Sequence, residues 1–175
     1  LDDLARFGDR TRNQHATDPI AAASRVAADL RGETPTPGAF ARGATSDLPF
    51  VQDLEARNAR PALCHYSVLK AQVLFLYGRL DLAEPLTEFV EAHLAYIPGH
   101  IAVAVHTFYA SLVAVGLAGT SNDVTPQRLG RARQGLQRLQ MWATSCPANF
   151  RHKALLVEAE LAAVGGDGWR AAEHY

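Results

Sequence analysis

The sequence predicts an all-α fold built from antiparallel helix pairs. Alanine and leucine are abundant, with 31 and 21 copies among 175 residues, and both favour helix. Apolar residues recur at helical spacing, and proline or glycine separates the segments. The chain is long enough to bury a sizeable core. We expect about seven helices, with residues 1–17 as a partly irregular N-terminal segment and residues 18–175 as one helical domain.

Capping residues mark the first two helices. Asp18 is the expected N-cap, and Pro19 takes the first position of a helix that extends to residue 31, as proline commonly does. A long loop rich in proline and glycine follows. Asp47 is then the expected cap of a short helix that ends at Asn58.

The next two expected helices carry an apolar face. The first spans residues 61–77, and Gly78 suits its C-terminal cap because glycine adopts the left-handed conformation there. The second spans residues 81–96, and it accepts Pro85 only because this residue lies near the first turn. The residues expected inside these two helices are Tyr66, Leu69, Val73, Leu76 or Tyr77, Leu82, Leu86, Phe89 or Val90, and Leu94.

Two further helices complete the domain. Thr125 and Pro126 start the first, which extends to Ser145, and the second spans residues 148–164. A turn at Gly165, Gly166 and Asp167 then precedes another helix, and the sequence stops inside it. This interrupted helix predicts that the chain is a piece of a larger protein. The residues expected inside are Leu129, Ala132, Leu136, Leu139 and Ala143, followed by Leu155, Leu156, Ala159 and Ala162.

Residues 101–118 are almost entirely apolar, so length alone makes this helix a candidate membrane span. Three polar residues, His106, Thr107 and Ser111, lie within it, and no basic cluster flanks it. A helix that is apolar on all sides is also typical of the centre of a helical array. We therefore expect a buried central helix and no membrane insertion.

An internal repeat indicates how the helices are arranged. Residues 71–83 and 159–171 share an alanine, a glycine seven positions later and a second alanine five positions beyond. Small residues allow two antiparallel helices to approach closely, and this pattern is typical of tetratricopeptide-like arrays. The copies lie 88 residues apart, which is not a multiple of the ~34-residue tetratricopeptide period. The sequence therefore predicts a tetratricopeptide-like superhelix with irregular units.

Several segments resemble one family of large proteins. They are CPANFRHKALLVEAE at 146–160, followed by GGDGWRAAEHY, and upstream LRGETPTPGAF, HYSVLKAQVLFLYGRLDLA and AVHTFYASLVAV. Over about residues 20–175 the chain resembles the helical region of bacterial and fungal signalling proteins. Those proteins join a serine/threonine kinase-like domain, a STAND-type ATPase, helical repeats, a GAF sensor and a histidine kinase. Gly168, where the family usually has an aromatic residue, and Pro85 depart from the family pattern.

The resemblance implies a segment between the ATPase and the sensor or kinase domains. In that position it would sense a ligand or partner and control ATPase or kinase output. The chain itself lacks the phosphate-binding loop, kinase and serine-hydrolase motifs. We therefore expect a non-enzymatic segment with no catalytic residue and no cofactor.

The content of charged residues, cysteine and histidine limits which partners and metals we expect. Lysine and arginine total 17 against 18 acidic residues, whereas nucleic-acid binders usually carry a basic excess, so we expect no nucleic-acid partner. Cys64 and Cys146 lie 82 positions apart, which favours two buried thiols in a reducing, cytoplasmic setting. The seven histidines lack the spacing of a metal site, so no metal is expected.

Charged residues form two stripes at helical spacing. Glu84, Glu88 and Glu91 make an acidic stripe, and the basic stripe consists of Arg128, Arg131 and Arg138. They are either complementary docking surfaces, between repeats or toward a partner, or two solvated helix faces. We favour solvated faces, since these are the more common arrangement.

Aromatic residues are further candidates for a groove that binds a protein or peptide. The candidates are Tyr66, Tyr77, Phe89, Phe108, Tyr109, Trp142 and Trp169. Aromatic packing between helix pairs is the alternative that we favour for most of them, whereas an exposed tryptophan is common at binding hot spots.

The leading hypothesis is a protein-interaction and coupling module of a multidomain ATPase or kinase signalling protein, with neighbouring domains of the same chain as partners. The alternative is a free-standing helical small-molecule sensor or enzyme. Its pocket would lie beside the 101–118 helix, with His106, Thr107 and Ser111 as polar lining. A third hypothesis is a rigid spacer between domains.

Overall fold

The computed structural model describes residues 13–41, 45–120 and 126–175, together with residues 3, 6 and 10. This part of the chain is all-α, as predicted, with eight α-helices and one 3₁₀ turn at Leu94–Tyr96. The helices are α2 (Gln14–Leu30), α3 (Leu48–Ala56), α4 (Arg60–Leu76), α5 (Leu80–Ala92), α6 (Ile101–Thr120), α7 (Pro126–Ser145), α8 (Pro147–Val164) and α9 (Gly168–His174).

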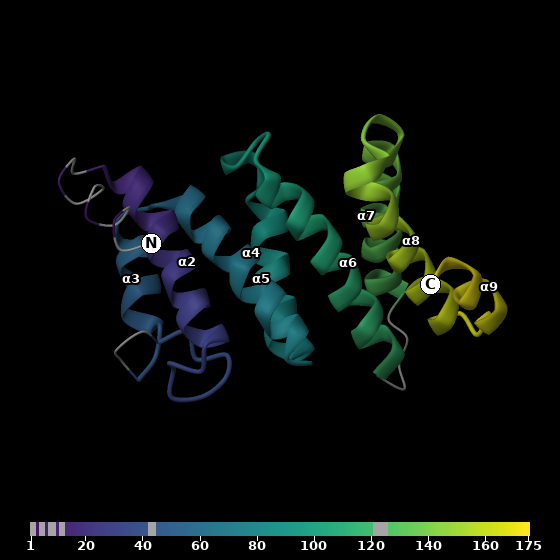
Figure 1. Ribbon diagram of the computed structural model, residues 1–175, viewed down its shortest axis with the longest axis horizontal. Coiled ribbons are helices and arrows are strands. Elements are labelled where there is room, and N and C mark those ends of the chain that lie inside the picture. The colour runs from purple at the N-terminus through teal and green to yellow at the C-terminus, as the bar shows by residue number, and fades with distance from the viewer. Residues whose placement is uncertain (1–2, 4–5, 7–9, 11–12, 42–44, 121–125) are drawn as a thin grey trace.

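The helices form an elongated row in which sequence neighbours pack antiparallel (Figure 1). Each contact of substance joins helices that are adjacent in sequence or separated by one helix, for example α4 with α5 and α4 with α6. The first and last described helices, α2 and α9, lie at opposite ends of the row. Such an arrangement gives each helix only local neighbours.

Helix α6 is the centre of the row and packs against α4, α5, α7 and α8. On one side, Val113 joins a core with Phe40, Tyr66 and Leu74. On the other side, Leu112 packs with Leu139 and Val157 in a core. By length and hydropathy the stretch Ile101–Gly119 is also suited to cross a membrane, and half of it is buried within the structure. The expected central helix is confirmed.

The start of α2 corrects the predicted boundary. The helix begins at Gln14, so Asp18 and Pro19 lie inside it rather than at its cap. The Asp18 carboxylate instead accepts two hydrogen bonds from Arg57, at 3.0 and 2.9 Å. Pro19 is the sixth residue of the helix, so it cannot donate the backbone hydrogen bond that other residues make there to the carbonyl four positions earlier.

Asp47 also differs from its predicted capping role. It occupies the N-cap position of α3, but its side chain makes no capping hydrogen bond. Its carboxylate accepts from the hydroxyl of Tyr66 and pairs with Lys70 at 2.5 Å. In both cases a tertiary partner replaces the local cap. The predicted cap at Thr125 lies outside the described residues.

The buried face of α5 differs from the predicted one. The helix ends at Ala92, four residues early, and Ala83, Thr87 and Val90 are buried. Leu82 is 43% exposed. Of the residues predicted to lie inside, Val90 is buried and Leu86 and Phe89 pack against the cores, whereas Leu82 does not.

Smaller corrections concern other expected core residues. Of the alternatives Leu76 and Tyr77, Leu76 is exposed and Tyr77 packs against the core. Cys146 is only half-buried, whereas Cys64 is fully buried. In α8 the buried residues are Ala154, Val157 and Ala159, so Leu155, Leu156 and Ala162 are less buried than expected. Gly78 confirms the predicted left-handed cap, with φ of +70°.

Candidate functional site

The acidic stripe of α5 and the basic stripe of α7 meet across α6. Arg128 donates to both carboxylate oxygens of Glu84, at 2.7 and 2.8 Å. Arg131 bonds to Glu84 at 2.8 Å and to Glu88 at 2.6 Å. We call this set, completed by Glu91 and Arg138 at 2.9 Å, the α5–α7 ladder. Its members are Glu84, Glu88, Glu91, Arg128, Arg131 and Arg138.

Helix direction explains why the two stripes match. The glutamates are spaced four and three residues apart, so they share one face of α5. The arginines are spaced three and seven apart, which also selects one face. Because α6 is antiparallel to both flanking helices, α5 and α7 run in the same direction, and partners pair in the same order along both helices. The stripes therefore pair with each other, and the interpretation as two solvated faces is wrong.

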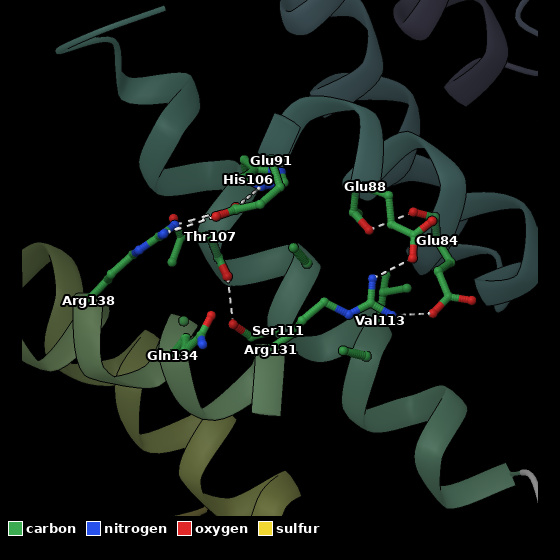
Figure 2. A pocket seen from close by; sticks show the side chains of 14 residues that line it. Glu84, Glu88, Glu91, His106, Thr107, Ser111, Val113, Arg131, Gln134 and Arg138 are labelled. Atoms are coloured by element: carbon green, nitrogen blue, oxygen red, sulfur yellow. Dashed lines mark hydrogen bonds and ion pairs between the residues drawn. The ribbon is translucent and has the colours of Figure 1, made fainter. Parts of the chain in front are cut away.

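A cavity of about 70 Å³ lies beside the ladder (Figure 2). Helix α6 contributes His106, Thr107 and Ser111, while α5 and α7 contribute the charged side walls. The three polar residues that the sequence placed on the central helix thus line one pocket. Among the hypotheses drawn from the sequence, only that of a small-molecule site had placed these three residues in one pocket.

The two hydroxyl groups of the pocket each donate a hydrogen bond to a backbone carbonyl. Thr107 Oγ1 donates to the carbonyl of Val103 at 2.8 Å, and Ser111 Oγ donates to the carbonyl of Thr107 at 2.7 Å. Each hydroxyl oxygen still has lone pairs that can accept a hydrogen bond. Toward the pocket, both residues therefore act as acceptors.

Gly135 sets how closely α7 approaches α6. A β-carbon at this position would lie 2.0 Å from Ser111 Oγ and 3.4 Å from the carbonyl oxygen of Thr107. A larger residue would force Ser111 Oγ to move, whereas the Thr107 carbonyl would remain at an ordinary contact distance. Glycine thus keeps the floor and one wall of the pocket in contact.

Hydrogen bonds keep the ladder carboxylates ionised. His106, which is 2% exposed, lies 3.0 Å from Glu91 through Nε2. This hydrogen bond, together with Arg138, lowers the pKa of Glu91 to about 2. The hydrogen bond from Arg128 likewise holds the pKa of Glu84 below its usual value. Both carboxylates are therefore charged at neutral pH.

One donor of the site has no acceptor. The Nε atom of Arg131 is buried and has no hydrogen-bond partner within the described part of the chain. Its terminal nitrogens are occupied by Glu84 and Glu88. A buried donor without an acceptor is costly, so this nitrogen is an unsatisfied group on a residue that lines the cavity.

The aromatic candidates lie in different environments. Tyr66 is 2% exposed within the core, and Tyr77 directs its hydroxyl to the carbonyl of Asp29 at 3.5 Å. Trp142 packs on Phe150 between α7 and α8. Phe89 is partly buried against two of the cores. Trp169 is 86% exposed on α9.

Of this set, Phe108 and Tyr109 are in ring contact on α6, with centroids 5.0 Å apart. Tyr109 also contacts Phe75 of α4. Phe108 and Trp142 pack against the same core, but the seven aromatic candidates together do not form one surface. Tyr66 in particular has no surface to offer a partner.

The pocket is also lined by Thr87, Gln134 and Gly135, which no sequence motif singled out. Their position one turn from ladder residues was a usable signal, since residues three or four apart share a helix face. Among the described residues, no group of three or more histidine, cysteine or acidic side chains could hold a metal ion. His65 and His100 do form a hydrogen-bonded pair at 3.1 Å.

No protein-family model, curated protein or solved structure matches this chain. The functional proposal therefore depends on the geometry of the ladder and its pocket.

Proposed function

We propose that this chain is a non-catalytic interaction and coupling module, built as a tetratricopeptide-like array of helix pairs. In this proposal it belongs to a larger cytoplasmic signalling protein with ATPase or kinase domains. Its partners are proteins or peptides, foremost the neighbouring domains of the same chain. It needs no cofactor for this role.

The positions of the two repeated segments support an array. Residues 71–83 cover the α4–α5 junction, and residues 159–171 cover the α8–α9 junction. Gly78 and Gly166 turn the chain there with φ of +70° and +81°. The 88 residues between the copies contain two helix pairs, so each pair averages 44 residues. Longer units of this kind explain why the spacing departs from the tetratricopeptide period.

The ladder is the observation that carries the coupling proposal. It joins the α4–α5 pair to the α6–α7 pair through charges that border an open cavity. A partner group that enters the cavity competes for these carboxylates and guanidinium groups. In an array with only local contacts, a change in one pair reaches the next pair through such an interface.

A peptide-display selection on the immobilised chain tests this role. We expect enriched peptides whose affinity, measured by fluorescence anisotropy, falls at least about tenfold for R131Q/R138Q. The matched controls are R133Q, an exposed arginine of the same helix, and R170Q, which removes an ion pair to Glu158 outside the ladder. Failure to enrich any peptide, or equal binding to all four proteins, would contradict the proposal.

A small-molecule sensor is the second candidate function. The specific observation in its favour is that His106, Thr107 and Ser111 all line the same cavity. In this role a small ligand, rather than a group of a partner protein, enters the cavity beside the ladder. The two candidates are separated by whether the pocket takes a free small molecule.

A further inference from the structure

We infer that the pocket between α5, α6 and α7 binds a small zwitterion of the α-amino-acid class, with one carboxylate and one ammonium group. This inference deepens the sensor candidate and rests on the pocket being a binding site. It does not require that a peptide partner exists.

The carboxylate end is assigned by the arginines. Arg131 lines the pocket, and its buried Nε–H has no acceptor within the described residues. Arg138 and Arg131 lie on opposite sides of Thr107 and Ser111 in the close view (Figure 2). The side chain of Arg138 is 40% exposed. A carboxylate has two oxygens with several lone pairs and suits guanidinium donors. Nε of Arg131 supplies the donor at this end, whereas Arg138 is held by Glu91 at 2.9 Å on the other side of the pocket (Figure 2).

The ammonium end is assigned by acceptors on the other part of the wall. Glu91 remains ionised at neutral pH, because its hydrogen bond to His106 and its pairing with Arg138 lower its pKa to about 2. Its side chain is 46% exposed, so a ligand can reach it. Thr107 Oγ1 donates a hydrogen bond to the carbonyl of Val103 and can accept one from an N–H group. An ammonium has three donors and no acceptor, which matches such a set.

The charge balance of the site favours a ligand without net charge. The ladder holds three glutamates and three arginines, all in ion pairs with one another. A simple anion or cation would add an uncompensated charge to a partly enclosed site, which is costly. A zwitterion adds one charge of each sign and keeps the balance.

The size of the site limits the ligand. About 70 Å³ corresponds to roughly five water positions. Ala110, Ala114 and Gly135 make part of the lining and leave room for a small side chain. Glycine, alanine and serine are therefore the probes of choice.

Isothermal titration calorimetry of the full chain at low salt provides the test. We expect saturable binding of at least one of the three amino acids. For that amino acid, the N-acetyl derivative lacks the ammonium and the methyl ester lacks the carboxylate, and both should bind at least about tenfold more weakly. Saturable binding of the free amino acid with these two losses would support the inference.

Two variants assign the residues. R131K keeps the positive charge but removes Nε–H, and T107V keeps the shape but removes the hydroxyl acceptor. Each should weaken binding by about tenfold, while R133Q on the exposed side of α7 should bind as the wild type does. Circular dichroism confirms folding, and if R131K fails to fold, T107V and the ligand analogues still decide the result.

Three outcomes would overturn the inference. They are no binding of any of the three amino acids up to about 10 mM, equal binding of the blocked analogues, and unchanged affinity in both R131K and T107V. Peptide binding that survives such a result would leave the coupling module intact. Loss of both activities would remove the ladder site altogether.

Discussion

Carboxylates have different surroundings at one end of this molecule and at its centre. Near α2, Asp29 is 2% exposed and accepts from the backbone N–H groups of Gly38 and Phe40 at 3.0 and 3.3 Å, and from Thr34 at 2.8 Å. Between α5 and α7, Glu84 is shared by two arginines and Glu91 by an arginine and a histidine, beside a cavity.

The difference separates charges that fix the fold from charges that can exchange partners. Asp29 holds a loop in which Phe40 is fully buried at φ of +52°, a backbone conformation that non-glycine residues adopt at a cost. No ligand can reach that carboxylate. The ladder side chains are partly exposed, and Glu84, Glu91 and Arg131 each have two partners between which they can exchange.

The largest effect is expected where the charge is buried. D29A leaves the N–H groups of Gly38 and Phe40 without acceptors, so we expect a loss of about 3 kcal/mol in the free energy of unfolding, measured with urea. E33A removes an exposed carboxylate from the same loop and should cost far less. Equal losses in the two variants would show that Asp29 does not fix the loop.

Close packing on the ladder side gives the next largest effect. G135A places a methyl group against Ser111 Oγ, so we expect a loss of about 2 kcal/mol from overpacking. The double variant S111A/G135A should recover most of this loss. G130A serves as a control on the same helix, because a β-carbon there meets nothing within 4 Å, and it should stabilise the protein by up to about 1 kcal/mol.

How much the sequence could predict depends on whether the signal was local. Proline and glycine marked the ends of α4, α7 and α8 well, since their effect on the backbone is local. Asp18 misled the prediction because its tertiary partner Arg57 is 39 positions away. On α5 the helical spacing found Val90 and Leu86 but also placed Leu82 inside, because an apolar residue in the pattern does not show whether a neighbouring helix covers it.

The candidate site shows the same limit. Helical spacing placed the glutamates on one face and the arginines on another, but their pairing depends on α5 and α7 running in the same direction. That relation is set by the intervening helix rather than by either stripe. The contact of Gly135 with Ser111 likewise joins residues whose proximity no local pattern indicates.

The salt dependence of stability distinguishes the ladder from the buried carboxylate Asp29. R131Q breaks the pairs to Glu84 and Glu88, and we expect a loss of about 1 kcal/mol in unfolding free energy at low salt, since these pairs are partly exposed. The loss should shrink in about 1 M salt, where charges are screened over ~3 Å. R133Q should show neither effect. A loss for R131Q that does not depend on salt would contradict an exchangeable ladder.

The smallest effect concerns pH. The pKa of Glu91 falls from its ordinary 4.5 to about 2 in the folded chain. Its contribution is therefore fully present above the unfolded pKa and is lost as the pH falls from about 5 toward 2. Because the side chain is 46% exposed, we expect less than about 1 kcal/mol. E91Q should flatten the acid side of the stability profile, and an unchanged slope would contradict the assignment.

The central claim is that the ladder joins α5 to α7, and hydrogen exchange of the α7 amides in E84Q/E88Q/E91Q tests it most directly. We predict that exchange in α7 rises at least about tenfold, although every substitution lies on α5. E158Q, which removes an ion pair between α8 and α9, serves as the control and should leave α7 amides unchanged. Faster exchange confined to α5, with α7 unaffected, would contradict the claim.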